Sequence, residues 1–243
     1  MRPLQVRAGG HSAQGMRPNN EDRFVADASR DVFLVADGMG GQDQGEKASS
    51  MAADILPRAV QIRLDSHIDP SQAVMQALWE ANRAILEASR HQAEGRRMGT
   101  TAVLALRQDD RVYVAGLGDS RAYLIRGDSV EQLTIDHTIA DALLRNGVLT
   151  PEQAQQSPYR HVLYKFLGCA DLSDSDEVRP FKPESGDRLV LASDGLTNFV
   201  TLDDLRQGAI RYGDPDAWAN ELVTLALERG SNDNVTCVVV DFA

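Results

Sequence analysis

Residues 32–38 read VFLVADG, so five apolar residues run directly into Asp37 and Gly38. A short apolar run that is bounded by glycine and aspartate is typical of a buried β-strand. The pattern recurs further along the chain, and in its last copy the acidic residue precedes the apolar run: VYVAGLGD at 112–119, LVLASDG at 189–195 and NDNVTCVVV at 232–240. We therefore predict buried strands that each carry an aspartate at one end.

The aspartates at these strand ends favour a metal site over simple turns. An Asp-Gly pair taken alone is ordinary turn chemistry, and each copy could end a strand and do nothing more. Clustered carboxylates, however, repel one another strongly unless a cation lies among them. A neighbouring glycine also lets another group approach the backbone closely. Because the pattern repeats at strand ends, we expect the aspartates to share a site for a metal with oxygen ligands.

Length and composition indicate a soluble globular protein and argue against a nucleic-acid surface. The 243 residues are 42% hydrophobic and 25% charged, with a formal net charge of −11, so there is little basic excess to neutralise phosphates. Cys169 and Cys237 lack the spacing of a metal-binding pair, and we expect two free thiols, as in a reducing cytoplasm. No apolar run approaches the roughly 18 residues of a membrane helix, and the N-terminus lacks the apolar region of a signal peptide. We expect a cytoplasmic protein.

Strand and helix signals come in blocks along the chain. Residues 4–37 read as strands with turns at Gly9-Gly10 and at 17–20, and residues 99–134 as strands with turns at 108–110 and 126–128. Helices are predicted over residues 43–65, 71–93 and 136–146, from Thr150, and around Trp218 before the final strand. Because the helices gather between runs of strands, the pattern favours an α+β fold in one domain.

Seven short blocks, in order, resemble the bacterial branch of the metal-dependent protein phosphatases, the PPM or protein phosphatase 2C family. The blocks are Arg17-x-x-Asn20-Glu21-Asp22, residues 35–41, Met98-Gly99-Thr100-Thr101, Gly118-Asp119-Ser120-Arg121, Asp136-His137-Thr138, Ser193-Asp194-Gly195-Leu196 and Asp233-Asn234-Val235-Thr236. The resemblance covers essentially the whole chain. It implies a four-layer αββα architecture, a two-sheet β-sandwich flanked by pairs of helices. It further implies one domain over residues 1–243, with a flap-like segment at about 138–168 beside the metal cleft.

The resemblance implies a serine/threonine phosphoprotein phosphatase. Such an enzyme hydrolyses phosphomonoesters with a hydroxide that bridges metal ions in a two- or three-metal centre. Two cations about 3.5–4 Å apart would activate the water and receive the anionic phosphoryl group. Mn²⁺ and Mg²⁺ prefer carboxylate, carbonyl and water oxygens, which fits candidate ligands that are all Asp, Glu and a glycine carbonyl. The implied cofactors are two Mn²⁺ or Mg²⁺ ions and a third that binds more weakly.

The resemblance also assigns the core of the metal site, whose three aspartates are the expected catalytic residues. Asp37 would bridge the two metals, and the carbonyl of Gly38 would bind one of them. Asp194 and Asp233 would hold the other metal. Asp119, together with Asp194, would hold the third.

Three further residues are placed around this core by the same resemblance. Glu21 and Asp22 match the acidic pair that supports the metals, directly or through water. Arg17 matches the arginine that grips the substrate phosphate, for which a planar guanidinium is well suited. Alternatives from the residues alone stay open: an acid in a solvated turn for Glu21 or Asp22, a surface side chain for Arg17 and, for Asp119, a turn cap.

The histidines leave the proton donor to the leaving group unassigned. His137 lies in a block where helix capping by Asp136 or Thr138 is an alternative to catalysis. His161 lies in the flap-like segment. Many relatives carry His-Pro where this chain has Ser157-Pro158, so the histidine of that pair is absent here. Eukaryotic members place a histidine at the position of Met39.

Two rival functions remain at this stage. The same scaffold could serve small phosphate esters, or it could be a non-catalytic module that binds metal or phosphoproteins. The expected partners are proteins phosphorylated on serine or threonine by an opposing kinase, without nucleic acid and without a membrane span.

Overall fold

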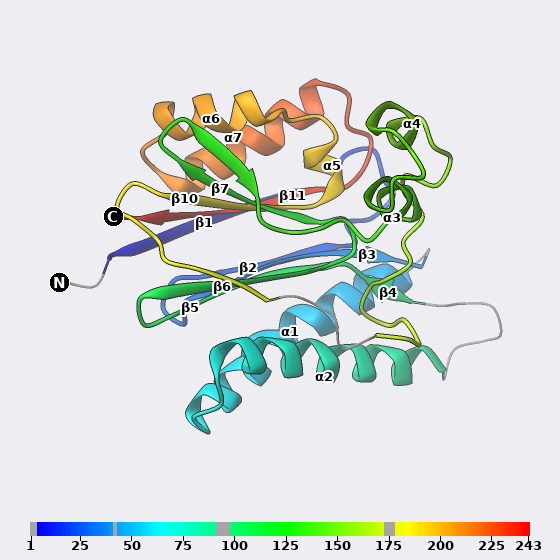
Figure 1. Ribbon diagram of the computed structural model, residues 1–243, viewed down its shortest axis with the longest axis horizontal. Helices are drawn as coiled ribbons and strands as arrows, with labels where there is room; N and C mark the ends of the chain where they lie inside the picture. The colour runs from blue at the N-terminus through cyan, green and yellow to red at the C-terminus, as the bar shows by residue number, and fades with distance from the viewer. Residues whose placement is uncertain (1–3, 41–42, 91–97, 173–177) are drawn as a thin grey trace.

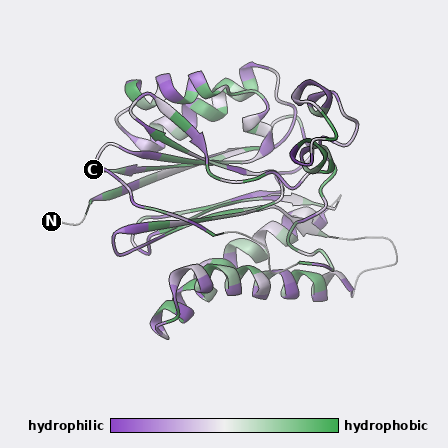
Figure 2. Ribbon diagram, in the orientation of Figure 1, coloured by the Kyte–Doolittle hydropathy of each residue, from purple (hydrophilic) through white to green (hydrophobic). Residues whose placement is uncertain are grey.

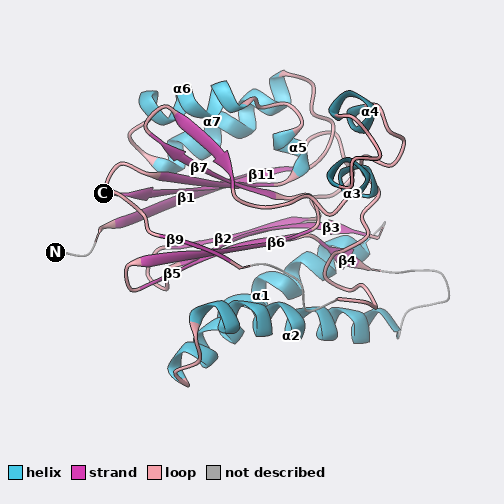
Figure 3. Cartoon of the chain, in the orientation of Figure 1, coloured by secondary structure: helices cyan, strands magenta, loops and turns pink. Residues whose placement is uncertain are grey.

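The computed structural model describes residues 4–40, 43–90, 98–172 and 178–243. Two antiparallel sheets pack face to face, and helices cover the outer face of each (Figures 1 and 3). The first sheet has the order β1 (Val6–Ala13), β11 (Val235–Phe242), β10 (Arg188–Ala192), β7 (Arg121–Arg126), β8 (Ser129–Gln132). The second has the order β2 (Asp22–Asp27), β3 (Val32–Met39), β5 (Ala102–Gln108), β6 (Arg111–Leu117), β9 (Arg179–Phe181), with β4 (Gly99–Thr100) paired to β3.

Seven helices complete the described part of the fold. The second sheet is covered by α1 (Asp43–Asp65) and α2 (Pro70–Arg90), and the first by α6 (Leu202–Arg211) and α7 (Pro215–Glu228). The remaining helices are short and lie at one end of the sandwich: α3 (Ile139–Arg145), α4 (Pro151–Gln155) and α5 (Asp194–Thr197). The predicted α+β class and the four-layer αββα architecture are confirmed.

Hydrophobic side chains fill all three interfaces between the four layers. Phe33 and Val238 pack between the two sheets, Leu34 packs toward α1 and α2, and Trp218 packs toward the first sheet. Alternate residues of β3 therefore face opposite sides, as the twofold period of a strand requires. Hydrophobic colour accordingly concentrates on the strands and on the helix faces toward them (Figure 2).

The turn predicted at Gly9-Gly10 is wrong, because both glycines lie inside β1. They pair with Val239 and Val238 of β11. A Cβ at Gly9 would lie 2.3 Å from the backbone of Asp216 in α7, and one at Gly10 would lie 2.4 Å from the ring of Phe24. These glycines permit close packing of a helix and of the opposite sheet, so their role is set by tertiary contacts.

Other boundaries shift by a few residues. The helix predicted from position 136 begins at Ile139, because Thr138 is its N-cap and accepts a hydrogen bond from the amide of Asp141 at 3.1 Å. The short helix predicted to start near Thr150 is present as α4, and a capping box at Thr150 begins it. Helix α6 was not predicted, and residues 91–93 of the predicted second helix lie outside the described residues.

Within the described ranges, no helix is long and apolar enough to cross a membrane.

Candidate metal centre

Four strands deliver their aspartates to one end of the sandwich. Asp37 is near the end of β3, Asp119 follows β6, Asp194 follows β10, and Asp233 precedes β11. Strands β10 and β11 are antiparallel neighbours, with Ala192 opposite Cys237, so the end of one lies beside the beginning of the other. Strands β2 and β3 pair Asp22 with Asp37 in the same way. The antiparallel topology thus gathers carboxylates that are far apart in the sequence.

The backbone of Asp37 is held from both sides. Its amide donates to the Thr101 hydroxyl at 3.0 Å, and its carbonyl accepts from the Thr100 hydroxyl at 2.9 Å and the Thr101 amide at 2.8 Å. Burial raises the pKa of the Asp37 carboxyl well above its usual range, and the nearby carboxylates of Asp22, Asp194 and others raise it further. A carboxylate that is so disfavoured by its surroundings is suited to a cation.

Asp22 contributes a buried oxygen without a protein donor. The residue is 2% exposed, and one carboxylate oxygen accepts from the Ser193 hydroxyl at 2.9 Å. No hydrogen-bond donor among the described residues reaches the other oxygen. Burial raises the pKa of Asp22 to about 6, and the charges of Asp194 and Asp233 add to this. An unsatisfied buried acceptor is costly, and this one belongs to a residue within the acidic cluster.

Close backbone packing joins Glu21, Gly38 and Gly45. The Gly38 amide donates to the Glu21 carbonyl at 3.2 Å, and the Ser49 hydroxyl donates to the same carbonyl at 2.5 Å. A Cβ at Gly38 would lie 2.2 Å from the Gly45 carbonyl oxygen, and one at Gly45 would lie 2.2 Å from the Glu21 carboxylate. The first turn of α1 therefore presses the end of β3 against Glu21, which only glycine permits.

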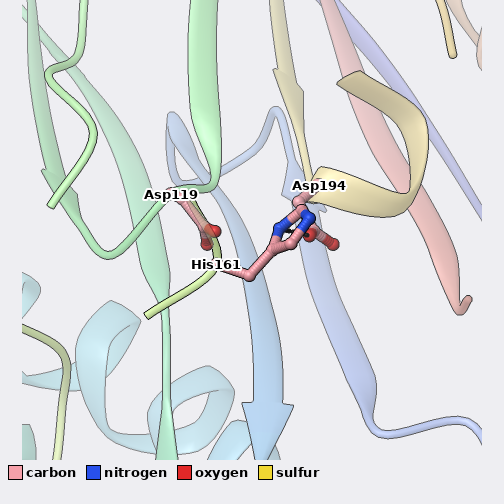
Figure 4. Close-up of side chains that lie close together, drawn as sticks. All are labelled: Asp119, His161 and Asp194. Carbon is pink, nitrogen blue, oxygen red and sulfur yellow. Dashed lines mark ion pairs between the residues drawn. The ribbon is translucent and has the colours of Figure 1, made fainter. Parts of the chain in front are cut away.

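Asp119, Asp194 and His161 form a second group at the same end (Figure 4). Each offers one ligand atom, and the three atoms all lie within 4.8 Å of one another. The Nδ1 atom of His161 is 3.8 Å from an oxygen of Asp194. Burial and the charge of Asp194 raise the pKa of Asp119 to about 7. The sequence assigned no role to His161. The residue is far from both acids along the chain, so no local sequence pattern indicates that they meet in space.

Arg17 lies at the rim of the acidic cluster. Its guanidinium donates to Asp233 at 2.6 Å, and this hydrogen bond, together with the Asp233 charge, raises the Arg17 pKa. The arginine side chain is 55% exposed, so it is accessible to a ligand. The structure therefore places Arg17 beside Asp233, and its contact with a substrate phosphate stays a prediction.

The Asp136-His137-Thr138 block anchors the segment 138–168. The Asp136 carboxylate accepts from Arg121 at 2.6 Å. The Nδ1 atom of His137 accepts from the Gly118 amide at 3.2 Å, and burial lowers the His137 pKa to about 4. The neutral imidazole thus fixes this segment to the loop that carries Asp119. The capping alternative is correct for Thr138, whereas Asp136 forms an ion pair instead.

Two cavities flank the cluster. One has a volume of about 1000 Å³ and the other of about 630 Å³, and their walls share five residues: Arg17, Asp119, His161, Asp194 and Asp233. Asp119, Asp194 and Asp233 consequently lie where the two cavities meet, whereas Asp37 and Glu21 line the smaller cavity alone.

Comparison with known proteins relates this site to phosphatases. Residues 9–225 match the family profile described as Protein phosphatase 2C. The protein phosphatase PhpP of Streptococcus pneumoniae is 37% identical over 238 residues, which is 92% of each chain. The structure of the serine/threonine phosphatase PstP/Ppp of Mycobacterium tuberculosis superposes with a TM-score of 0.83 at 31% identity over 98% of both chains. The catalytic domain of PstP in complex with two manganese ions gives 0.81 at 31% identity over 99% of both chains.

Proposed function

The chain belongs to the protein phosphatase 2C family and is a serine/threonine phosphatase, and we propose that it acts through a metal centre held by Asp37, Asp194 and Asp233. The observation that carries this proposal is the convergence of strand-end carboxylates beside two cavities, with Asp194 and Asp233 in both walls and Asp37 in the wall of the smaller one. The non-catalytic alternative is not favoured by any feature of this site, because all the acidic residues that the resemblance requires are present.

The donor set fits Mn²⁺ or Mg²⁺. Every ligand atom of the proposed centre is an oxygen, and hard divalent cations select oxygen ligands. We assign Asp37 and the Gly38 carbonyl to the centre, with Asp194 and Asp233 completing it. The unsatisfied oxygen of Asp22 supports this fit, since it lacks a donor among the described residues.

The remaining acids have supporting roles in the proposal. Asp119 and Asp194 would hold a third ion, and the group in Figure 4 supports this assignment because carboxylate oxygens of the two residues lie within 4.8 Å of one another. Glu21 is held at the centre by its backbone, whose amide donates to the Asn234 side chain at 2.8 Å. Glu21 and Asp22 would thus position the metals directly or through water.

The bound cations, Arg17 and His137 have separate roles in the proposed reaction. When bound, two divalent cations supply positive charge for the phosphoryl group and lower the pKa of a water that attacks it. Arg17 binds and orients the phosphate with its exposed guanidinium. His137 does not deliver the leaving-group proton, because it is neutral near pH 7 and accepts a hydrogen bond from Gly118. Its part is to hold the segment that borders the cavity.

We further propose that the substrates are proteins phosphorylated by a serine/threonine kinase, and that the chain acts in the cytoplasm as one domain. The two free cysteines support a reducing compartment. Continuous packing through the four layers supports the single domain.

Hydrolysis of a phosphothreonine peptide and of p-nitrophenyl phosphate tests the proposal. EDTA should abolish both activities, and Mn²⁺ or Mg²⁺ should restore them, with Ca²⁺ a poor substitute because it prefers larger coordination shells. Full activity after exhaustive chelation would refute the metal mechanism. Tight binding of the peptide without hydrolysis at saturating Mn²⁺ would identify a binding module instead.

A further inference from the structure

The larger cavity extends from the acidic cluster along the segment 138–168. Its wall includes Asp119 and Asp194 of the cluster and Ala154 and Gln155 of α4. Because the cavity begins at the carboxylates, the residues next to a phosphorylated side chain would enter it. The side chains along this wall would therefore contact the polypeptide of the substrate.

Most charged side chains of this wall already have a partner of opposite charge. Arg121 pairs with Asp136 at 2.6 Å, and Arg17 pairs with Asp233 at 2.6 Å. Asp141 of α3 forms an ion pair with Arg145.

Arg160 is different. It is exposed on the cavity wall, and it forms no ion pair with any residue in the described part of the chain. Its guanidinium has one hydrogen bond, at 3.5 Å to the Ser157 carbonyl, which is at the limit of such bonds. Arg58 and Arg83 are also exposed and form no ion pair among the described residues, but neither lines this cavity, whereas Arg160 does.

We propose that Arg160 selects substrates that carry a second anionic group, a carboxylate or another phosphate, close to the phosphorylated residue. This inference rests on the proposed function of the neighbouring site. His161, the next residue, lies 3.8 Å from Asp194, so Arg160 is one residue away from the acidic cluster. An extended peptide advances by about 3.4 Å per residue, so the second anion lies within a few positions of the phosphothreonine. A guanidinium binds either kind of anion with paired hydrogen bonds.

The test is steady-state kinetics on matched phosphothreonine peptides. A reference peptide has only alanine within three positions of the phosphothreonine. Others place one glutamate, one lysine or one phosphonate analogue of phosphoserine at single positions on either side. We expect the wild type to prefer the best acidic peptide over the reference by about three- to tenfold in kcat/KM, mainly through KM, since exposed charge pairs are weak and a bidentate contact is at the strong end. The phosphonate arm separates a phosphate requirement from a carboxylate one.

Arg160 variants decide whether this residue is responsible. Arg160→Ala should bring the acidic-to-reference ratio close to one, Arg160→Lys should keep part of it, and Arg160→Glu should favour the lysine peptide. Arg83→Ala, an exposed arginine of α2, removes the same charge elsewhere and should keep the wild-type ratio. High salt should reduce the wild-type preference.

Two outcomes would overturn the inference. One is an acidic-to-reference ratio in Arg160→Ala equal to that of wild type and Arg83→Ala. The other is an equal loss on every peptide and on p-nitrophenyl phosphate, which would make Arg160 a structural residue. A wild type that hydrolyses neither substrate with Mn²⁺ would overturn the proposed function itself. The ratio and the absolute rate thus separate the two failures.

Discussion

Replacing Gly38 with alanine should damage the candidate metal centre by steric force alone. Gly38 does not have a positive φ, so alanine is compatible with its backbone conformation. The added Cβ, however, would lie 2.2 Å from the Gly45 carbonyl oxygen, 2.4 Å from the Gly45 carbonyl carbon and 2.6 Å from the Glu21 carbonyl oxygen. All three are backbone atoms, which no rotamer change can move aside. The end of β3, the start of α1 and the loop before β2 must separate by about 1 Å for the methyl group to reach normal contact.

The magnitude follows from this displacement. Extra methyl groups in a packed interior cost about 1–3 kcal/mol, and we expect the upper end because backbone has to move. The shift also displaces the Gly38 carbonyl and Glu21 from Asp37. Disturbing the groups that orient metal ligands weakens metal affinity by about 10- to 100-fold. We therefore expect a loss of about 3 kcal/mol in unfolding free energy and at least a tenfold weaker apparent Mn²⁺ affinity.

Urea denaturation in EDTA measures the first effect, and Mn²⁺ titration of phosphatase activity measures the second. Gly213→Ala is the matched control, because a Cβ there has no neighbour within 4 Å in the described structure and its φ is not positive. It should change stability by no more than about 0.5 kcal/mol. If Gly38→Ala matched this control in both stability and Mn²⁺ affinity, the close packing around Gly38 would not be essential to the site.

Three further predictions address the charged residues. Asp194→Asn should retain less than about a tenth of wild-type activity at saturating Mn²⁺ while its circular dichroism is unchanged, because metal ligands act as a unit; a higher rate would remove Asp194 from the ligand set. Arg17→Ala should lower kcat/KM about ten- to a hundredfold, mainly through KM, and Arg17→Lys should recover only part of this loss. An unchanged KM in Arg17→Ala would show that Arg17 is a surface side chain without a role in phosphate binding. The pKa of Asp119 is raised to about 7 from 3.8, so metal-free protein should lose stability as pH rises from about 4 to 7, and Asp119→Asn should not share this loss. Urea titrations in EDTA should show the stability advantage of Asp119→Asn growing by about 2 kcal/mol between pH 5 and 8, a figure already reduced for solvent access; a constant difference would contradict the raised pKa.

The fold class and the family were predictable from the sequence. The strand patterns ending in Asp37 and Asp194 were visible because alternation, apolar runs and turn residues are local properties of the chain. The order of the motif blocks then identified the family. The structure confirms the architecture and brings the predicted acids together at one end, whereas their individual roles remain predictions.

Tertiary structure alone decided how distant residues meet. Gly9 and Gly10 looked like a turn, but they lie within a strand because α7 and Phe24 pack against them. His161 and Arg160 are consecutive loop residues, yet one lies beside Asp194 and the other on the cavity wall without an ion pair in the described chain. Local sequence determines which conformations a segment prefers, whereas packing between segments distant in sequence determines what each side chain contacts.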